Sequence, residues 1–207
     1  MFSFSTRLYA ITDRQISGLS LAEQVSQLSQ GGARLIQLRE KDRPAREFYG
    51  DAEAAVRVAR SNGARIIIND RADIALALQV DGVHLGQNDL PPEAARRLLG
   101  PDAVIGLSTH NAEQARRASH LAIDYLAIGP IFATQTKRNP EPVVGLDGLR
   151  RVRDAIGELP LVAIGGITAE NASKVIRAGA DAVAVIGGLL AGPAGIQRRT
   201  SELLALL

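Results

Sequence analysis

Eight short apolar runs, separated by longer stretches of helical pattern, constrain the fold of this 207-residue chain more than any other feature. The runs are short and rich in β-branched and aliphatic residues, which is typical of strands buried on both faces of a parallel sheet. Eight strand–helix units predict a closed (β/α)8 TIM barrel of the α/β class. The predicted strands are Leu8–Ile11, Leu35–Leu38, Arg65–Ile68, Gly82–Leu85, Val104–Leu107, Tyr125–Ile128, Leu161–Ile164 and Ala182–Ile186.

The main alternative is an open doubly wound sheet, which usually has fewer strands. A dinucleotide-binding sheet of that kind would also carry a glycine-rich turn after its first strand. Thr12-Asp13-Arg14 stands there instead. The barrel repeat leaves no residues over for a second unit, so we expect a single domain over residues 1–207.

Helix boundaries can be read from capping residues, proline and glycine. Ser20 and Glu23 have the spacing of a capping box at a helix start. The other expected boundaries are a stop at Gly31-Gly32, a helix between Pro44 and Gly63, and starts at Pro92, Asn111 and Thr168.

Composition excludes several classes of function. The chain has no Cys, which rules out thiol nucleophiles, disulfides and thiolate metal sites and fits a reducing compartment. A net charge of +2 and 3% aromatic residues argue against a nucleic-acid surface, despite a sequence pI near 9.3. We also find no signal peptide and no apolar run of the ~18 residues that a membrane span needs. A cytoplasmic protein is therefore expected.

Two carboxylates follow neighbouring predicted strands. Asp70 comes directly after Arg65–Ile68 and Asn69, and Asp89 follows Gly82–Leu85. Adjacent strands lie about 4.8 Å apart, and two like charges 4 Å apart repel by roughly 4 kcal/mol at an effective dielectric of 20. A hard divalent cation would remove that repulsion, and oxygen ligands favour Mg²⁺. The simpler alternative is that each aspartate only caps the helix that follows it, at Arg71 or at Pro91-Pro92.

Cations and glycines follow other predicted strands, where the active sites of such barrels lie. Arg39, Lys41 and Lys137 could together hold a phosphate-bearing ligand, although solvation at the surface would also explain Arg39 and Lys41. The pairs Gly165-Gly166 and Gly187-Gly188 either bind phosphate through backbone N–H groups or simply form tight turns. Two separate phosphate zones suggest an enzyme that joins a diphosphate ester to a phosphate ester.

The three histidines receive different interpretations. His84 is expected to pack inside the barrel rather than to bind a ligand. His110 follows a predicted strand and is a candidate site residue, whereas His120 is expected on a helix surface.

The motifs together resemble the thiamine phosphate synthase family, from about Leu8 to Leu190. Any one of them would be a weak signal, but the set is highly specific. They are Gln37-Leu38-Arg39-Glu40-Lys41-Asp42, Ile68-Asn69-Asp70-Arg71, the run from Asp81 to Asp89, Gly129-Pro130-Ile131-Phe132, Thr134-Gln135-Thr136-Lys137 and Ala163-Ile164-Gly165-Gly166-Ile167.

This resemblance implies a transferase. It would condense 4-amino-2-methyl-5-hydroxymethylpyrimidine diphosphate with 4-methyl-5-(2-phosphoethyl)thiazole to give thiamine phosphate and pyrophosphate. In the family the step is dissociative: pyrophosphate leaves first, and the thiazole nitrogen captures the resulting cation. No protein nucleophile is required, and Mg²⁺ is the implied cofactor.

The resemblance also implies roles for individual residues. Asp70 and Asp89 would bind Mg²⁺, and Ser108 would act near the pyrimidine. Arg39, Lys41, Ser108 and Lys137 are the expected catalytic group. The pyrimidine diphosphate would be held by Gln37, Arg39, Lys41, Asn69 and Lys137, and the thiazole phosphate by Thr134, Thr136, Gly166, Ile186 and Gly187, with Gly165 beside them in the glycine turn.

Two positions depart from the family pattern. Gly187 stands where Ser is common, so a hydroxyl contact to the thiazole phosphate is lost, and Asn139 stands where Asp is common. We expect neither change to be disabling. The loop Phe132–Gly145 is the longest near the site and is a candidate lid.

Two other functions are considered beside the synthase. One is a thiazole tautomerase, with His110 as the acid–base group, and the other is a non-catalytic paralogue that binds thiamine precursors. Retention of the metal-binding and diphosphate-binding residues argues against both. Small-molecule substrates are the expected partners, and a homo-oligomer is left open.

Overall fold

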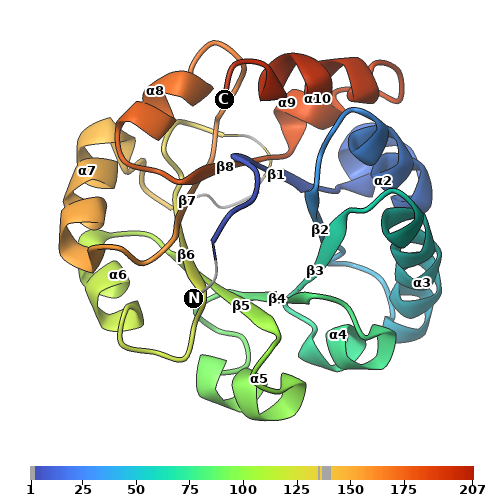
Figure 1. Cartoon of the computed structure of the whole chain (residues 1–207), viewed down its shortest axis with the longest axis horizontal. Coiled ribbons are helices and arrows are strands. Elements are labelled where there is room, and N and C mark those ends of the chain that lie inside the picture. Colours follow the sequence, from blue (N-terminus) through green and yellow to red (C-terminus); the bar gives the residue numbers. More distant parts are fainter. Residues whose placement is uncertain (1–2, 135, 137–140) are drawn as a thin grey trace.

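A computed structural model gives the structure of residues 3–134, 136 and 141–207. Its eight parallel strands pair in chain order, and β8 pairs back with β1, so the barrel is closed (Figure 1). The predicted (β/α)8 barrel is therefore confirmed, and the open sheet is wrong. The strands are β1 Leu8–Ile11, β2 Leu35–Leu38, β3 Arg65–Asn69, β4 Gly82–Leu85, β5 Val104–Thr109, β6 Tyr125–Ile128, β7 Leu161–Ile164 and β8 Ala182–Val185.

Helices form a ring outside the barrel (Figure 1). None of those in the described part of the chain is long and apolar enough to cross a membrane. Their bounds are α1 Arg14–Ser17, α2 Leu21–Gln30, α3 Ala45–Ser61, α4 Ala72–Leu78, α5 Pro92–Leu99, α6 Ala112–Ala118, α7 Gly145–Ile156, α8 Ala172–Arg177, α9 Gly187–Leu190 and α10 Ile196–Leu204.

Most of the expected helix boundaries are confirmed. The Ser20 hydroxyl accepts the N–H of Glu23 while the Glu23 carboxylate accepts the N–H of Ser20, which completes the capping box of α2. Asn111 caps α6 by accepting the N–H of Gln114 with its side chain. Thr168 is wrong as a helix start. Its N–H donates to the side chain of Asn171 in a turn, and α8 begins only after that turn.

The apolar core has two layers. One lies between the strands and the surrounding helices, and the other fills the barrel itself, where Tyr9 and Tyr125 are the largest side chains. The segment before β1 passes across one end of the barrel (Figure 1). There the ring of Phe4 packs edge-on against Tyr125, with ring centroids 5.5 Å apart. This side chain covers the end of the barrel at which the strands begin.

Three aspartates reinforce that same end, each one residue before an even-numbered strand. Every one of their carboxylates accepts a backbone N–H from the preceding strand at 2.7 Å and also pairs with an arginine. In such barrels this face serves stability, whereas the opposite face carries the chemistry. The pairs are Asp81 with Arg65, Asp124 with Arg96, and Asp181 with Arg153.

Candidate active site

A cavity of about 690 Å³ opens at the carboxyl ends of the strands. It is lined by all but one of the site residues predicted from the sequence. The exception, Lys137, lies outside the described residues, as do Asn139 and the rest of 135 and 137–140 in the candidate lid. Those in the lining are Gln37, Arg39, Lys41, Asn69, Asp70, Asp89, Ser108, Thr134, Thr136, Gly165, Gly166, Ile186 and Gly187. The fold thus gathers these side chains, and their individual roles stay predictions.

Asp70 and Asp89 interact directly. Asp70 has a left-handed backbone (φ +63°), and its N–H donates to the carbonyl of His84 on the next strand at 2.8 Å. Burial raises the pKa of Asp70 from 3.8 to about 6, with smaller contributions in the same direction from the hydrogen bond and the charge of Asp89. Lys41 and Arg39 partly oppose this rise. The chain therefore holds a carboxylate in a place that disfavours its charge.

Neither aspartate caps a helix. Arg71 precedes α4 and Pro91 precedes α5, so these residues occupy the N-cap positions. Asp89 instead accepts the N–H of Gly86 at 2.6 Å and so closes its own turn. The helix-cap explanation of this pair is wrong.

The raised pKa of Asp70 predicts how stability changes with pH. Folding favours the protonated carboxyl, so the protein without divalent cation should lose stability as the pH rises from about 4 to 6. Asp70→Asn cannot ionise, and Asn also tolerates a positive φ. At pH 7 in EDTA we expect the variant to be about 1 kcal/mol more stable than the parent, after allowance for solvent screening, which is roughly 2–4 °C in Tm.

Thermal unfolding of both proteins between pH 3.5 and 7.5 would test this. The difference should become small near pH 3.5, where the carboxyl is largely protonated in both the folded and the unfolded state. A parent that is more stable than the variant at pH 7 in EDTA would contradict the expectation.

Arg39 is held by the loop after β1. Its Nη1 lies 2.8 Å from Oδ2 of Asp13, and its backbone N–H donates to Thr12 Oγ1 at 3.1 Å. The other carboxylate oxygen of Asp13 caps α1 by accepting the N–H groups of Gln15 and Ile16. The half-buried guanidinium is therefore fixed, which rules out simple surface solvation. Sequence reasoning missed Asp13, because Thr12-Asp13-Arg14 was considered only as a turn without glycine.

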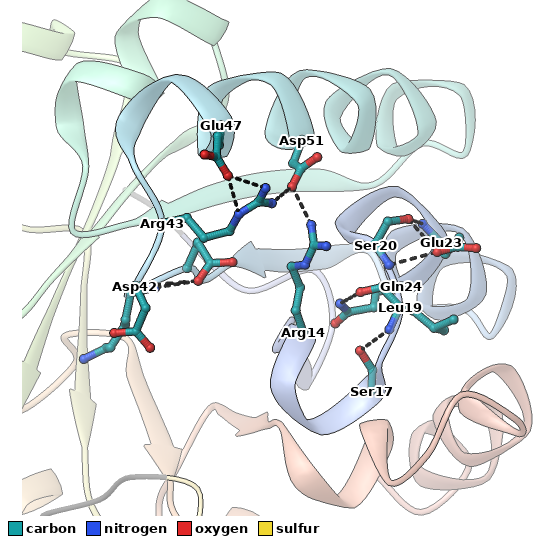
Figure 2. A network of polar contacts seen from close by, with 12 residues as sticks. Arg14, Ser17, Leu19, Ser20, Glu23, Gln24, Asp42, Arg43, Glu47 and Asp51 are labelled. Carbon is teal, nitrogen blue, oxygen red and sulfur yellow. Dashed lines mark hydrogen bonds and ion pairs between the residues drawn. The ribbon is translucent and has the colours of Figure 1, made fainter.

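A second polar network anchors the loop between β2 and α3, which carries Lys41. Figure 2 shows Arg14 and Arg43 converging on Asp51, with Arg43 also paired to Glu47. Arg14 comes from α1, and both acids come from α3. These ion pairs tie the loops that follow β1 and β2 to the same helix.

Five polar side chains form a continuous hydrogen-bonded chain across the inside of the barrel. Gln37 Nε2 donates to the Tyr9 hydroxyl at 2.9 Å, and the hydroxyls of Tyr9 and Tyr125 are 3.0 Å apart. The Tyr125 hydroxyl lies 2.8 Å from His84 Nδ1, and His84 Nε2 lies 2.8 Å from Ser108 Oγ. Burial lowers the pKa of His84 to about 4 and raises that of Tyr9. All five groups are therefore neutral at pH 7.

The three histidines lie in different surroundings. His84 packs inside the barrel, as predicted, but its ring also reaches the cavity. His110 lines the cavity with Nδ1 2.8 Å from the carbonyl of Gly129. His120 is exposed in the turn just after α6.

Asn69 presents an unusual donor to the cavity. Its side-chain Nδ2 is buried and has no hydrogen-bond partner among the described residues. A buried polar group without a partner is costly, so such a group in a cavity wall indicates a ligand acceptor.

Backbone conformation and steric crowding explain the two glycines after β7. Gly165 and Gly166 have φ of +102° and +63°. A Cβ on Gly165 would lie 2.5 Å from Pro130 Cβ, and one on Gly166 would lie 2.5 Å from the carbonyl oxygen of Ala133. The chain therefore needs glycine here both for the turn and for close approach to the loop after β6. At Gly187, by contrast, a Cβ would make only an ordinary contact, 3.7 Å from Thr136 Oγ1.

Comparison with known proteins assigns the family. The family model described as thiamine monophosphate synthase matches residues 8–189. The chain belongs to this family. A thiamine-phosphate synthase of Koribacter versatilis is 50% identical over 206 residues, which cover 97% of this chain and 95% of the relative. Another, from Syntrophomonas wolfei, is 46% identical over 184 residues, or 88% of each chain.

A solved structure agrees with this membership of the thiamine monophosphate synthase family. Thiamine phosphate pyrophosphorylase from Pyrococcus furiosus matches with a TM-score of 0.86 and 36% identity, covering 97% of this chain and 94% of that one. The resemblance read from the sequence motifs is confirmed. With it, the transferase interpretation holds over the isomerase and the non-catalytic paralogue.

Proposed function

We propose that the cavity joins 4-amino-2-methyl-5-hydroxymethylpyrimidine diphosphate to 4-methyl-5-(2-phosphoethyl)thiazole, releasing pyrophosphate and forming thiamine phosphate. The observation that carries the proposal is the arrangement around the opening. Arg39, Lys41, Asp70 and Asp89 belong to the loops after β2, β3 and β4, and the glycine turns follow β7 and β8. One cavity therefore offers two separate zones for phosphate groups.

The residues present fit a magnesium ion. The half-buried carboxylate of Asp70 lies against Asp89, and this pair would offer the ion oxygen ligands. The described residues contain no cluster of three or more His, Cys, Asp or Glu that could enclose a metal. Magnesium is commonly held by one or two carboxylates, with substrate phosphates and water as its other ligands. When bound, it would neutralise charge on the diphosphate and so help that group to leave.

The chain's own cations serve the same leaving group. Arg39 is held in place by Asp13, so its guanidinium meets the diphosphate with little loss of side-chain freedom. Lys41 adds a second positive charge from the same loop, and the Nδ2 of Asn69, which has no partner among the described residues, can donate to a phosphate oxygen. We place Lys137 in the same group on the family pattern.

The reaction then depends on electrostatics and alignment. Departure of pyrophosphate leaves a cation on the pyrimidine methylene carbon, and the thiazole nitrogen forms the new C–N bond. Preorganised positive groups stabilise charge that develops on the leaving oxygen, and the cavity holds the two rings in contact. Ser108 and Gln37 would orient the pyrimidine. No side chain has to act as a nucleophile or general base.

The thiazole phosphate is assigned to the opposite side of the cavity. Gly165 and Gly166 bring bare backbone close to the loop that carries Thr134 and Thr136. α9 begins at Gly187, directly after Ile186. The N–H groups of its first residues have no acceptor within the helix. Backbone donors and threonine hydroxyls suit a phosphate monoester.

The decisive experiment is to incubate the protein with both substrates and Mg²⁺ and to follow thiamine phosphate and pyrophosphate. Equal amounts of both products are expected, and none when either substrate or Mg²⁺ is omitted. Isomerisation of a thiazole phosphate without consumption of the pyrimidine diphosphate would overturn the proposal. A cytoplasmic location and a homo-oligomer stay predictions.

Asp13→Asn tests whether the positioning of Arg39 matters. The amide keeps one oxygen to cap α1, but it loses the ion pair and turns an N–H toward the guanidinium. We expect the KM for the pyrimidine diphosphate to rise about tenfold, since a charge-assisted bond is worth roughly 1.5–3 kcal/mol. The KM for the thiazole phosphate should stay within twofold. Steady-state kinetics with each substrate varied in turn would measure both; an equal rise in the two KM values would contradict the assignment.

A further inference from the structure

The buried chain from Gln37 to Ser108 joins two cavity residues that lie on different sides of the barrel. Gln37 is on β2 and Ser108 on β5, while Tyr9, Tyr125 and His84 come from β1, β6 and β4. The three linking residues are all at least nine-tenths buried. Tyr125 is not part of the cavity lining described above, so it acts on a ligand only through its neighbours.

The hydrogen bonds give this chain a direction. Gln37 Nε2 can only donate, so the Tyr9 oxygen accepts and its single proton is free to go to Tyr125. Tyr125 in turn donates to His84 Nδ1. A neutral imidazole that accepts at Nδ1 carries its proton on Nε2, which then donates to Ser108 Oγ.

Both ends of the chain are therefore fixed. Ser108 accepts from His84, which leaves its own hydroxyl proton available to the cavity as a donor. Gln37 uses its amide nitrogen on Tyr9, which leaves Oε1 available as an acceptor. Reversing any one link would reverse every other link and exchange the two roles. The backbone carbonyl of Ser108 is separately held by Gln87 Nε2 at 2.6 Å.

We propose that Tyr9, Tyr125 and His84 are positioning residues that fix Ser108 as a donor and Gln37 as an acceptor, so that the cavity selects a 4-aminopyrimidine over its 4-oxo counterpart. This rests on the proposed function, which brings a pyrimidine to these two residues. An aminopyrimidine edge offers a ring-nitrogen acceptor beside an amino donor. The 4-oxo form offers a carbonyl acceptor beside an N–H donor, which is the reverse order. A site with fixed polarity pairs with one order and leaves its buried groups unpaired with the other.

The first test reads the proton order directly, without turnover. ¹⁵N NMR of histidine-labelled protein distinguishes a protonated ring nitrogen from a bare one. His84 is assigned by the signals lost in His84→Gln, since the chain has three histidines. We expect a proton on Nε2 and a bare Nδ1. A proton on Nδ1 would reverse the chain and overturn the proposal.

The second test measures selectivity as binding. Calorimetry with Mg²⁺ and no thiazole phosphate gives the Kd of the 4-amino pyrimidine diphosphate and of its 4-oxo analogue. We expect the parent to prefer the amino form by at least 100-fold, and Tyr125→Phe to reduce this preference by at least tenfold. Tyr125→Phe keeps the ring that packs on Phe4 and removes one oxygen. An unchanged preference in a folded Tyr125→Phe protein would overturn the proposal.

Tyr49→Phe is the matched control, because Tyr49 lies on α3 with 36% of its surface exposed. Its preference should equal that of the parent. Tyr9→Phe breaks the same hydrogen-bonded chain one link away and should lower the preference as Tyr125→Phe does. It replaces Tyr125→Phe in this test if that variant fails to fold. If the parent binds neither pyrimidine, the proposed function fails, while the NMR result still decides the proton order.

Discussion

Asp89→Ala is expected to lower the rate of thiamine phosphate formation about 10³-fold at saturating substrates and 5 mM Mg²⁺, roughly the loss that follows removal of a preorganised electrostatic group from an active site. The cause is that Asp89 supplies one of the two carboxylates that meet in the cavity. On the proposed function, a single carboxylate would leave the magnesium ion with half of its protein ligands, and the charge on the departing pyrophosphate would be poorly neutralised. Pyrophosphate release, followed over a range of Mg²⁺ concentrations, would measure the effect.

Two further variants separate charge from structure. Asp89→Asn keeps an oxygen for the N–H of Gly86, so the turn can remain closed while the negative charge is lost. It should be nearly as inactive as Asp89→Ala. Asp73→Ala removes an aspartate of α4 whose side chain is 63% exposed, and it should leave the rate unchanged. Full activity in Asp89→Asn would show that its charge is not needed.

The sequence was most informative about the strands. Five of the eight predicted strands agree with the structure at both ends; β3 and β5 run slightly further, and β8 ends at Val185 rather than Ile186. Short β-branched runs between turn residues leave little choice of position, because each run must be buried on both faces. Closure of the barrel then places the residues after each strand at one end. This is why residues as distant in sequence as Arg39 and Gly187 could be assigned to one cavity.

Side-chain partners were harder to predict. Asp13 lies next to the first strand in the sequence, yet its pairing with Arg39 depends on the side chains of two adjacent loops. The chain through Tyr9, Tyr125 and His84 depends on which residues point inward at one level of the barrel. That is set by the stagger between strands, which the pattern of apolar residues leaves open when both faces of every strand are buried.

Thr168 shows a different limit. A threonine before a helical pattern is a common N-cap, but the side chain of Asn171 accepts the N–H of Thr168 and stabilises a turn there. Such competition between neighbouring capping residues is decided by local geometry. α8 therefore begins only after Asn171.

Gly166→Ala is the second change for which we expect a large loss. Alanine at φ +63° is strained by about 1 kcal/mol, and its Cβ would also lie 2.5 Å from the Ala133 oxygen and 2.7 Å from Phe132 Cβ. Backbone and Cβ atoms cannot move aside as a flexible side chain does, so the loop that leads to Thr134 must shift. We expect kcat/KM for the thiazole phosphate to fall about 10²-fold, since a displacement of about 1 Å at a positioned group can cost that much.

Gly63→Ala separates the effect of backbone strain from the effect of steric overlap of the new Cβ. Gly63 has almost the same backbone conformation, at φ +66°, but nothing lies within 4 Å of the position of its Cβ. It follows α3, away from the cavity lining. Both variants should lose a few degrees of Tm, whereas only Gly166→Ala should lose activity, and its KM for the pyrimidine diphosphate should change much less than that for the thiazole phosphate. If the two glycine variants had equal activity, close approach at Gly166 would not be needed for binding, and the tight turn alone would explain this glycine.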